Sequence, residues 1–325
     1  MSMRSFDYDL PASAIAQTPI EPRDAARLLV ALDERGLVEH RRVADLPDIL
    51  EEGDVLVVNE TRVLPARLRL QKATGGAVEV LLLEELDGQW EALVRPGRRV
   101  PPGTVLTNGP GLVVEVGDYV GEGRRRVRVE GDIAVHGHAP LPPYIHTDLA
   151  DAERYQTVYA TKPGSVAAPT AGLHLTDAVL ERCRNRGIET AKVDLAVGLD
   201  TFRPVTAERP EDHQIHSERY RVPRQTLEAC RQARRVVAVG TTTVRALESA
   251  ARGSLEGRTS LFIHGDFEFK VVDVLLTNFH LPRSSLLLLL SSFAGERWRD
   301  LYKTALHDGY RFLSFGDAML VGRRQ

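Results

Sequence analysis

Several features that mark large classes of protein are scarce in this sequence. Only two of its 325 residues are cysteine, Cys183 and Cys230, and their spacing is not that of a metal site, so we expect two reduced thiols. The longest apolar run, residues 286–290, is far too short to span a membrane. The N-terminal residues are charged early and have no signal-peptide core. Together these absences predict a cytoplasmic protein.

Neither sign of charge dominates the composition. Lysine and arginine number 42 against 45 aspartate and glutamate, a formal net charge of -3, so a nucleic-acid partner would need local clusters of arginine rather than bulk charge. The sequence has no Gly-Lys-Ser/Thr phosphate loop and no Gly-x-Gly-x-x-Gly after a strand. It therefore lacks the marks of a Walker-type or dinucleotide-binding fold.

The pattern of elements divides the chain into three parts. Between residues 65 and 145, short β-type runs follow one another, separated by turn signals such as Gly75-Gly76 and Asn108-Gly109, which is typical of a small barrel or sandwich. The flanking parts, 1–64 and 146–325, alternate apolar runs with helical patterns and read as α/β. We predict an α/β domain into which a β-barrel domain is inserted.

The most unusual stretch is 164–176, Gly-Ser-Val-Ala-Ala-Pro-Thr-Ala-Gly-Leu-His-Leu-Thr. Its small side chains let the backbone come close to another group, and it carries one imidazole, His174, just before a helical pattern that Thr176 would cap. One interpretation is a ligand-binding loop that leads to the open N–H groups of a helix start. The other is a tight turn packed against the core.

Polar groups follow four of the predicted buried strands, at 59–62, 198–203, 240–245 and 277–280. If these strands are parallel, all four exits open on one edge of the sheet, where α/β proteins bind ligands. Such a site would hold arginine, histidine, asparagine, threonine and aspartate, a set suited to positioning and proton transfer. Ordinary polar strand-to-loop exits are the alternative.

Two histidines three residues apart, His213 and His216, lie among four acidic residues. On one helix face they would suit zinc, but no third ligand is obvious from the spacing. A role in proton transfer or substrate contact, or a structural pair, fits the pattern better. We expect no metal.

Arginines cluster at two places in the predicted barrel. Arg95 and Arg98 lie in one turn, and alternation along a strand would put Arg124, Arg126 and Arg128 on one face. These side chains would suit RNA phosphates, or they form a solvated barrel face. Elsewhere, the charged residues around Arg23 are typical of a solvated turn.

Ten strings of residues carry a resemblance to one family, the S-adenosylmethionine:tRNA ribosyltransferase-isomerases of queuosine biosynthesis, nearly from end to end. The strings are Phe6-Asp-Tyr-Asp-Leu-Pro11, Val58-Asn-Glu-Thr-Arg-Val63 with Pro65-Ala-Arg67, Leu141-Pro-Pro-Tyr-Ile145, Tyr155-Gln-Thr-Val-Tyr159, Ala168-Pro-Thr-Ala-Gly-Leu-His174, Asp212-His213 with His216-Ser-Glu218, Val239-Gly-Thr-Thr-Thr-Val-Arg245, Thr277-Asn-Phe-His-Leu-Pro282, Tyr302-Lys303 and Tyr310-Arg-Phe. The resemblance implies a three-layer α/β domain with an inserted β-barrel.

The resemblance also implies a reaction. The ribosyl part of S-adenosylmethionine moves to 7-aminomethyl-7-deazaguanine at the tRNA wobble position, giving epoxyqueuosine-tRNA, adenine and methionine. S-adenosylmethionine is then a consumed substrate, and we expect no cofactor. The expected partners are S-adenosylmethionine and a tRNA with a GUN-type anticodon carrying the 7-deazaguanine precursor, bound by a monomer with no membrane partner.

We assign roles on these strings. For catalysis we expect His174, His280, His213 and His216, on the argument that imidazole has a pKa near the working pH. For substrate binding we expect Asn59, Arg62, Thr170, Gly172, Asp200, Thr241, Thr242, Arg245 and Asn278.

The sequence departs from the family pattern at Gly198-Leu-Asp-Thr-Phe202, where the family usually has Gly-Ala-Gly-Thr-Phe, and at Leu175, where it usually has Phe. The added carboxylate of Asp200 keeps open an enzyme of the same fold with a different acceptor. A non-catalytic RNA-binding protein that uses the barrel is the other alternative.

Overall fold

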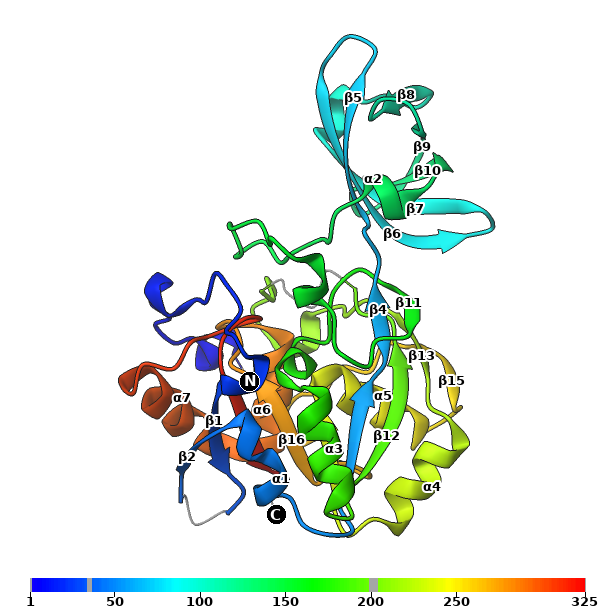
Figure 1. Ribbon diagram of the computed structural model, residues 1–325. Coiled ribbons are helices and arrows are strands. Elements are labelled where there is room, and N and C mark those ends of the chain that lie inside the picture. The colour runs from blue at the N-terminus through cyan, green and yellow to red at the C-terminus, as the bar shows by residue number, and fades with distance from the viewer. Residues whose placement is uncertain (1, 34–36, 199–203, 325) are drawn as a thin grey trace. The chain divides into compact units, whose positions relative to one another are not determined.

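The computed structural model describes residues 2–33, 37–198 and 204–324. These form two compact units (Figure 1). The α/β unit comprises residues 1–61, 142–162 and 168–325, and the barrel unit comprises residues 62–141 and 163–167. The predicted fold class, α/β with an inserted barrel, is confirmed. The predicted domain boundaries, after residue 64 and after residue 145, stay a prediction.

A nine-stranded sheet forms the centre of the α/β unit, in the order β15-β13-β12-β3-β14-β16-β17-β1-β2. Its strands are β1 (Arg27–Ala31), β2 (Glu39–Arg42), β3 (Val55–Asn59), β12 (Glu189–Leu195), β13 (Glu218–Arg221), β14 (Val236–Val239), β15 (Glu256–Thr259), β16 (Val274–Asn278) and β17 (Ala318–Gly322). Every residue of β3, β14, β16 and β17 is buried, as the continuous apolar runs of strands covered on both faces require.

Four neighbouring strands of this sheet run parallel. β12 pairs with β3, β3 with β14, and β14 with β16, each in parallel register. The carboxyl ends of all four therefore meet at one edge, and the prediction that their polar exits share an edge is confirmed for the described residues. Residues 199–203 of the exit after β12 lie outside them. Beyond β16 the direction changes, because β17 pairs with it antiparallel.

Helices cover both faces of the sheet, which gives three layers (Figure 1). On one face Val179 and Cys183 of α3 share a buried cluster with Leu56 and Val58 of β3; the alternate residues of β3 point to the other face, which α4 and α5 cover. The helices are α1 (Leu46–Ile49), α3 (Asp177–Asn185), α4 (Arg224–Gln232), α5 (Thr241–Ala250), α6 (Ser285–Ala294) and α7 (Trp298–His307). Within the described residues, no helix has both the length and the apolar character that crossing a membrane requires.

Short 3-10 helices connect many of these elements. They are η1 (Met3–Phe6), η2 (Ala12–Ala14), η3 (Arg23–Ala25), η4 (Val43–Asp45), η6 (Ala152–Tyr155), η7 (Thr170–His174), η9 (Pro210–Asp212) and η10 (Gly295–Arg297). The small-residue stretch forms η7, in which Ala171 to His174 are all buried. Thr176 then caps α3 as predicted, its Oγ1 accepting from the Val179 N–H at 3.2 Å.

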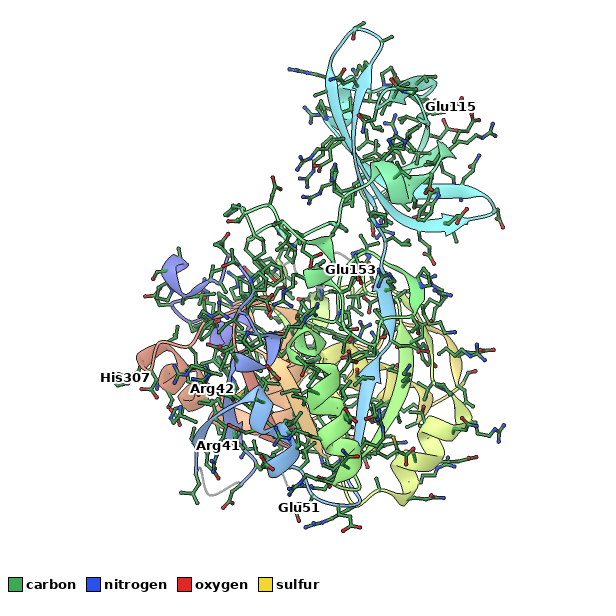
Figure 2. The ribbon with its side chains drawn as sticks, viewed as in Figure 1. Arg41, Arg42, Glu51, Glu115, Glu153 and His307 are labelled. Carbon is green, nitrogen blue, oxygen red and sulfur yellow. The ribbon has the colours of Figure 1, made fainter. Side chains whose placement is uncertain are left out.

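The barrel unit contains a closed antiparallel barrel in the order β10-β7-β6-β5-β8-β9. Its elements are β5 (Arg67–Lys72), β6 (Ala77–Leu86), β7 (Gln89–Arg95), η5 (Gly97–Arg99), β8 (Thr104–Thr107), β9 (Leu112–Gly121), β10 (Arg124–Gly131) and the short helix α2 (Ile133–His136). Alternate residues fill its interior, among them Leu68, Val80 and Val114. On β9, Glu115 lies between the buried Val114 and Val116 and is exposed (Figure 2). β4 (Thr61–Val63) and β11 (Lys162–Ser165) form a separate two-stranded sheet.

Candidate active site

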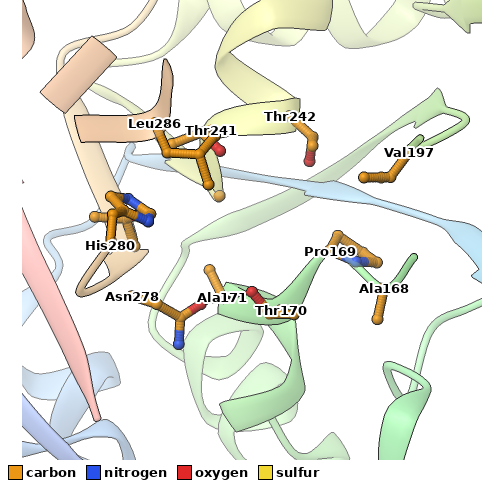
Figure 3. A pocket seen from close by; sticks show the side chains of 12 residues that line it. Ala168, Pro169, Thr170, Ala171, Val197, Thr241, Thr242, Asn278, His280 and Leu286 are labelled. Carbon is orange, nitrogen blue, oxygen red and sulfur yellow. Dashed lines mark hydrogen bonds between the residues drawn. The ribbon is translucent and has the colours of Figure 1, made fainter. Parts of the chain in front are cut away.

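A pocket of about 320 Å³ opens at the edge of the α/β unit where the four parallel strands end (Figure 3). The lining residues come from the small-residue stretch, the start of α5, the end of β16 and the segments after β12 and β16, namely Ala168, Pro169, Thr170, Ala171, Val197, Gly240, Thr241, Thr242, Thr277, Asn278, His280 and Leu286. An adjoining hollow of about 300 Å³ shares Thr170, Asn278, His280 and Leu286 with it.

A hydrogen-bonded chain of three side chains runs behind this pocket. The Thr170 hydroxyl donates to Asn278 Oδ1 at 2.9 Å, and Asn278 Nδ2 donates to His174 Nε2 at 3.0 Å. His174 Nε2 must then carry a lone pair, so its proton sits on Nδ1. The chain links η7 to the end of β16 and orients the Asn278 amide within the pocket wall.

Burial keeps His174 uncharged. The residue is 4% exposed, and burial, followed by the nearby charges of Arg311, Arg154 and Arg23, lowers the pKa of its imidazole to about 4. Both causes disfavour the cation. The side chain lines a smaller hollow of about 230 Å³, whose lining does not include Asn278.

His280 lies in the pocket wall itself, just after β16. Its Nε2 lies 3.0 Å from Thr277 Oγ1, and its backbone N–H donates to the Tyr302 hydroxyl at 2.8 Å. Burial lowers the pKa of this imidazole to about 3. The prediction that these two imidazoles have a pKa near the working pH is therefore wrong, because burial disfavours their charged forms.

The N-terminus of α5 faces the same pocket. The residue before it is Gly240, whose φ of +87° favours glycine, and no side chain in the described part of the chain caps the helix there. The first N–H groups of a helix have no partner within it, so those of Thr241 and Thr242 are available at the pocket wall. The loop was expected to lead to open N–H groups at the start of α3, but Thr176 itself accepts from the Val179 N–H there, so the helix start that faces the pocket is that of α5.

Asn59 supports this wall without lining the pocket. Its Nδ2 donates to the Leu195 carbonyl at 3.0 Å and to Thr242 Oγ1 at 3.4 Å, while its Oδ1 accepts from the N–H groups of Thr61 and Leu195 at 3.2 and 3.1 Å. These bonds use all the donors and acceptors of the amide. Asn59 therefore ties the ends of β3 and β12 together and holds Thr242 in place.

Arg245 also lies behind the pocket rather than in it. Its guanidinium forms a buried ion pair with Glu218 and donates to the Leu261 carbonyl at 3.0 Å. Glu218 in turn accepts from the Gly198 N–H at 2.9 Å. Arg245 thereby anchors the start of the segment that carries Asp200, which itself lies outside the described residues.

The remaining predicted site residues of the α/β unit lie away from the pocket lining. Gly172 is packed so tightly that an added Cβ would be 2.0 Å from the Tyr159 hydroxyl, so the position needs glycine for close approach. His213 packs edge-on against Phe262 at 5.3 Å between ring centroids, and His216 is half-buried. Arg62 belongs to the barrel unit. Among the described residues no cluster of metal-ligating side chains occurs.

The barrel arginines face acidic residues across the strands. On β10, Arg126 lies directly opposite Glu91, and Arg128 opposite Glu115. Arg124 lies within 3.5 Å of Glu91 and 3.4 Å of Glu122. Opposite charges in cross-strand pairs stabilise a sheet, and here they also reduce the positive field of this face. Arg98 lies in η5 and Arg95 ends β7.

Some lining residues had no signal in the sequence. Leu286 and Val197 are ordinary apolar residues in helix and loop patterns, and Ser314 of the adjoining hollow is likewise unmarked. Its hydroxyl lies 2.7 Å from that of Tyr144, which does belong to one of the family strings, 141–145. Ala168 belongs to the small-residue stretch, whose composition does point to a ligand.

Comparison with known proteins identifies the family. The model of the family described as queuosine biosynthesis protein matches residues 3–321. The chain belongs to this family. It is 51% identical to the S-adenosylmethionine:tRNA ribosyltransferase-isomerase of Thermus thermophilus, over 98% of this chain and 99% of the other. It is 52% identical to that of Rubrobacter xylanophilus, over 99% and 98%.

A solved structure of the queuosine biosynthesis family supports the fold. The crystal structure of S-adenosylmethionine tRNA ribosyltransferase from Thermotoga maritima is 39% identical to this chain, with a TM-score of 0.57, and covers 97% of this chain and 99% of its own. The family resemblance drawn from the ten strings is therefore confirmed.

Proposed function

We propose that this enzyme transfers the ribosyl moiety of S-adenosylmethionine to 7-aminomethyl-7-deazaguanine at the wobble position of tRNA, with isomerisation to epoxyqueuosine and release of adenine and methionine. The observation that carries the proposal is the identity of about half of all residues, over nearly the whole length of both chains, with enzymes bearing this name. The expected tRNA has a GUN-type anticodon, and the enzyme acts as a cytoplasmic monomer without a cofactor.

The pocket chemistry suits a substrate that carries a positive charge. The sulfonium of S-adenosylmethionine is a cation, and a protonated imidazole beside it would add repulsion. Burial keeps both His174 and His280 neutral at pH 7, so His280 in the pocket wall meets the sulfonium as a dipole that can accept a hydrogen bond, and His174 behind Asn278 adds no positive charge. Small lining residues such as Ala168 and Ala171 let the substrate approach the backbone.

Each group of the wall receives a role in this proposal. His280 contacts the reacting centre and exchanges a proton with it, since it lies in the wall and Thr277 orients its ring. His174 acts through Asn278, which it holds in one orientation. The N–H groups at the start of α5 donate to ribosyl oxygens. Catalytic roles for His213 and His216 and a substrate contact for Asp200 stay predictions.

The test is adenine release from S-adenosylmethionine, measured with tRNA that carries 7-aminomethyl-7-deazaguanine, with the same tRNA carrying guanine, and without RNA. Release only with the modified tRNA, together with a gain of mass on the RNA, is the expected result. Release without RNA would favour a different acceptor. Binding of tRNA with no release under any condition would overturn the proposed reaction in favour of an RNA-binding protein.

The pocket's role needs its own control. His280→Gln should lower single-turnover adenine release at least a hundredfold, the usual size of a lost acid-base group. His146→Gln, at an exposed histidine of the same unit, should keep the wild-type rate. Equal rates for both variants would remove His280 from the chemistry.

A further inference from the structure

We propose that Arg23, Arg154 and Arg311 form an oxyanion-binding site next to His174, which takes a phosphate or carboxylate group of a substrate. The anionic group has two possible sources, a phosphate of the tRNA backbone or the carboxylate of S-adenosylmethionine. Only this choice of sources rests on the proposed function. The three arginines come from η3, η6 and the segment after α7.

The site is a hollow of about 230 Å³ within the α/β unit. Its lining includes Arg23, Arg154, His174 and Ser314, together with apolar residues such as Ile20 and Phe315. Arg311 does not line the hollow, but its Nη1 donates at 3.3 Å to the carbonyl of Thr18, which directly precedes the lining residue Pro19.

These arginines donate most of their hydrogen bonds to backbone carbonyls, which carry no net charge. Arg23 donates to the carbonyls of Gln156 at 2.6 Å and Glu153 at 2.9 Å, and Arg154 donates to that of Ile20 at 2.7 Å. These bonds fix the guanidinium groups in place. The acceptors of these bonds are uncharged, and several positive charges close together in a partly buried setting are unfavourable without an anion.

Two buried donors have no partner among the described residues: Nη1 of Arg154 and Nη2 of Arg311. A buried donor without an acceptor costs stability, and two of them beside one hollow are explained by an acceptor that arrives with a ligand. A guanidinium matches the planar, two-oxygen edge of a carboxylate or phosphate.

The acidic residues nearby lie on the solvent side. Glu21 pairs with Arg154, but its side chain is 68% exposed, so solvent screens the pair. Asp151 and Glu153 also act on Arg23 and are exposed. Burial and then the charge of Arg154 lower the pKa of the Arg23 guanidinium, although these three acids act to raise it.

The hollow adjoins the pocket of the proposed reaction. Ser314 lines both this hollow and the one that shares Asn278 and His280 with the pocket. His174 faces the arginines and contacts Asn278. A substrate in the pocket can therefore extend one anionic group into the arginine cluster.

The test measures equilibrium binding to wild type, Arg311→Gln and Arg154→Gln, without any turnover. The probes are S-adenosylmethionine, its decarboxylated analogue, and tRNA carrying 7-aminomethyl-7-deazaguanine at several salt concentrations. Arg182→Gln is the matched control, because it removes the same charge from an arginine that is 49% exposed and paired with Asp48. It should bind all three probes within about twofold of wild type.

The two sources give different results. If the site takes the substrate carboxylate, the Arg variants lose about tenfold or more in affinity for S-adenosylmethionine, and the decarboxylated analogue binds wild type and variants alike. If it takes a phosphate, affinity for tRNA falls by a similar factor and the salt slope decreases by about one. Unchanged affinity for every probe overturns the proposal.

A measurement on the wild-type chain avoids the risk that a variant misfolds. Inorganic phosphate should move the His174 ring resonances in NMR and raise the pKa of that imidazole from about 4, because a bound anion offsets the arginine charges. Resonances that stay unchanged at high phosphate would count against the site, whereas Arg311→Lys, which keeps the charge, should retain part of the shift. Absence of adenine release from a protein that passes these tests would overturn the proposed function and leave the anion site standing.

Discussion

The two buried histidines of the pocket region predict a particular sensitivity to acid. His174 and His280 are 4% and 6% exposed, and burial lowers their pKa values to about 4 and about 3. In the unfolded chain each imidazole has its ordinary pKa of about 6.5. Below that pH the unfolded chain takes up two protons that the native protein does not. Stability must therefore fall as the pH falls from about 6.5 toward the folded pKa values.

The magnitude follows from linkage. Each histidine contributes a slope of about 1.4 kcal/mol per pH unit once the pH is below the unfolded pKa. Between pH 7 and pH 5 each lowers the free energy of unfolding by about 2 kcal/mol, and the two together by about 4 kcal/mol. That is a large share of the total stability of an ordinary domain. Neither side chain is exposed enough for solvent screening to reduce the effect.

The assay must report on the α/β unit alone, because the barrel unit can unfold separately. The chain has two tryptophans, of which Trp298 is buried in the α/β unit and Trp90 lies in the barrel unit. In a Trp90→Phe background, urea unfolding followed by tryptophan fluorescence therefore reports on the α/β unit. Unfolding curves at pH 7, 6 and 5 give the slope.

The comparison is between the parent, His280→Gln and His174→Gln. Each variant loses one buried imidazole, so its stability should fall by about 2 kcal/mol less between pH 7 and pH 5 than that of the parent. The control is His146→Gln, since His146 is exposed. If the variants and the parent lose the same free energy over this range, the imidazoles are already charged in the native protein and the reasoning is refuted.

Three further changes test the wall behind the pocket. Gly240→Ala places a side chain at a φ of +87° and should lower the free energy of unfolding by about 1 kcal/mol or more in the same urea assay. An unchanged free energy would show that this backbone conformation does not require glycine. Glu218→Gln strips the buried Arg245 of its charge partner, and a loss of about 3 kcal/mol or more is expected, which Arg245→Met in the same chain should partly restore. Asn278→Asp puts a carboxylate 3.0 Å from His174 Nε2 and should raise that imidazole's pKa by about one to three units in an NMR titration; a pKa still near 4 would contradict the contact.

The central strands were predictable from local pattern, whereas the edge strands were not. Val236–Val239 is a continuous apolar run and forms β14 with every residue buried. In contrast, β2 reads Glu-His-Arg-Arg and all four of its residues are exposed. It forms because its backbone pairs with β1, and its side chains carry no signal of that pairing. The reversal at β17 likewise depends on a neighbour distant in sequence.

The polar strand exits were predictable as a group, but the target of each side chain was not. Asn59 and Arg245 follow buried strands as ligand-binding residues do, yet the first bonds to Leu195 and the second to Glu218. Such a choice depends on which partner the fold brings within reach, and spacing along the chain does not encode it. Arg23 shows the reverse case. Its charge was typical of a solvated turn, but its guanidinium is held by the carbonyls of Gln156 and Glu153.

The distribution of charge around His174 and His280 supports one substrate orientation. The pocket wall offers the neutral imidazole of His280 and backbone N–H groups, whereas Arg23 and Arg154 line the hollow on which His174 lies. A sulfonium cation is repelled by those arginines and is tolerated only at the neutral wall, whereas an anionic group of the same or a second substrate is attracted to them. The separation of neutral and cationic surfaces therefore orients the reactants before any proton moves. Arg311→Glu reverses the charge of one arginine. It should weaken the separation of cationic and anionic substrate groups more than Arg311→Gln does, because the added carboxylate would draw the sulfonium away from His280.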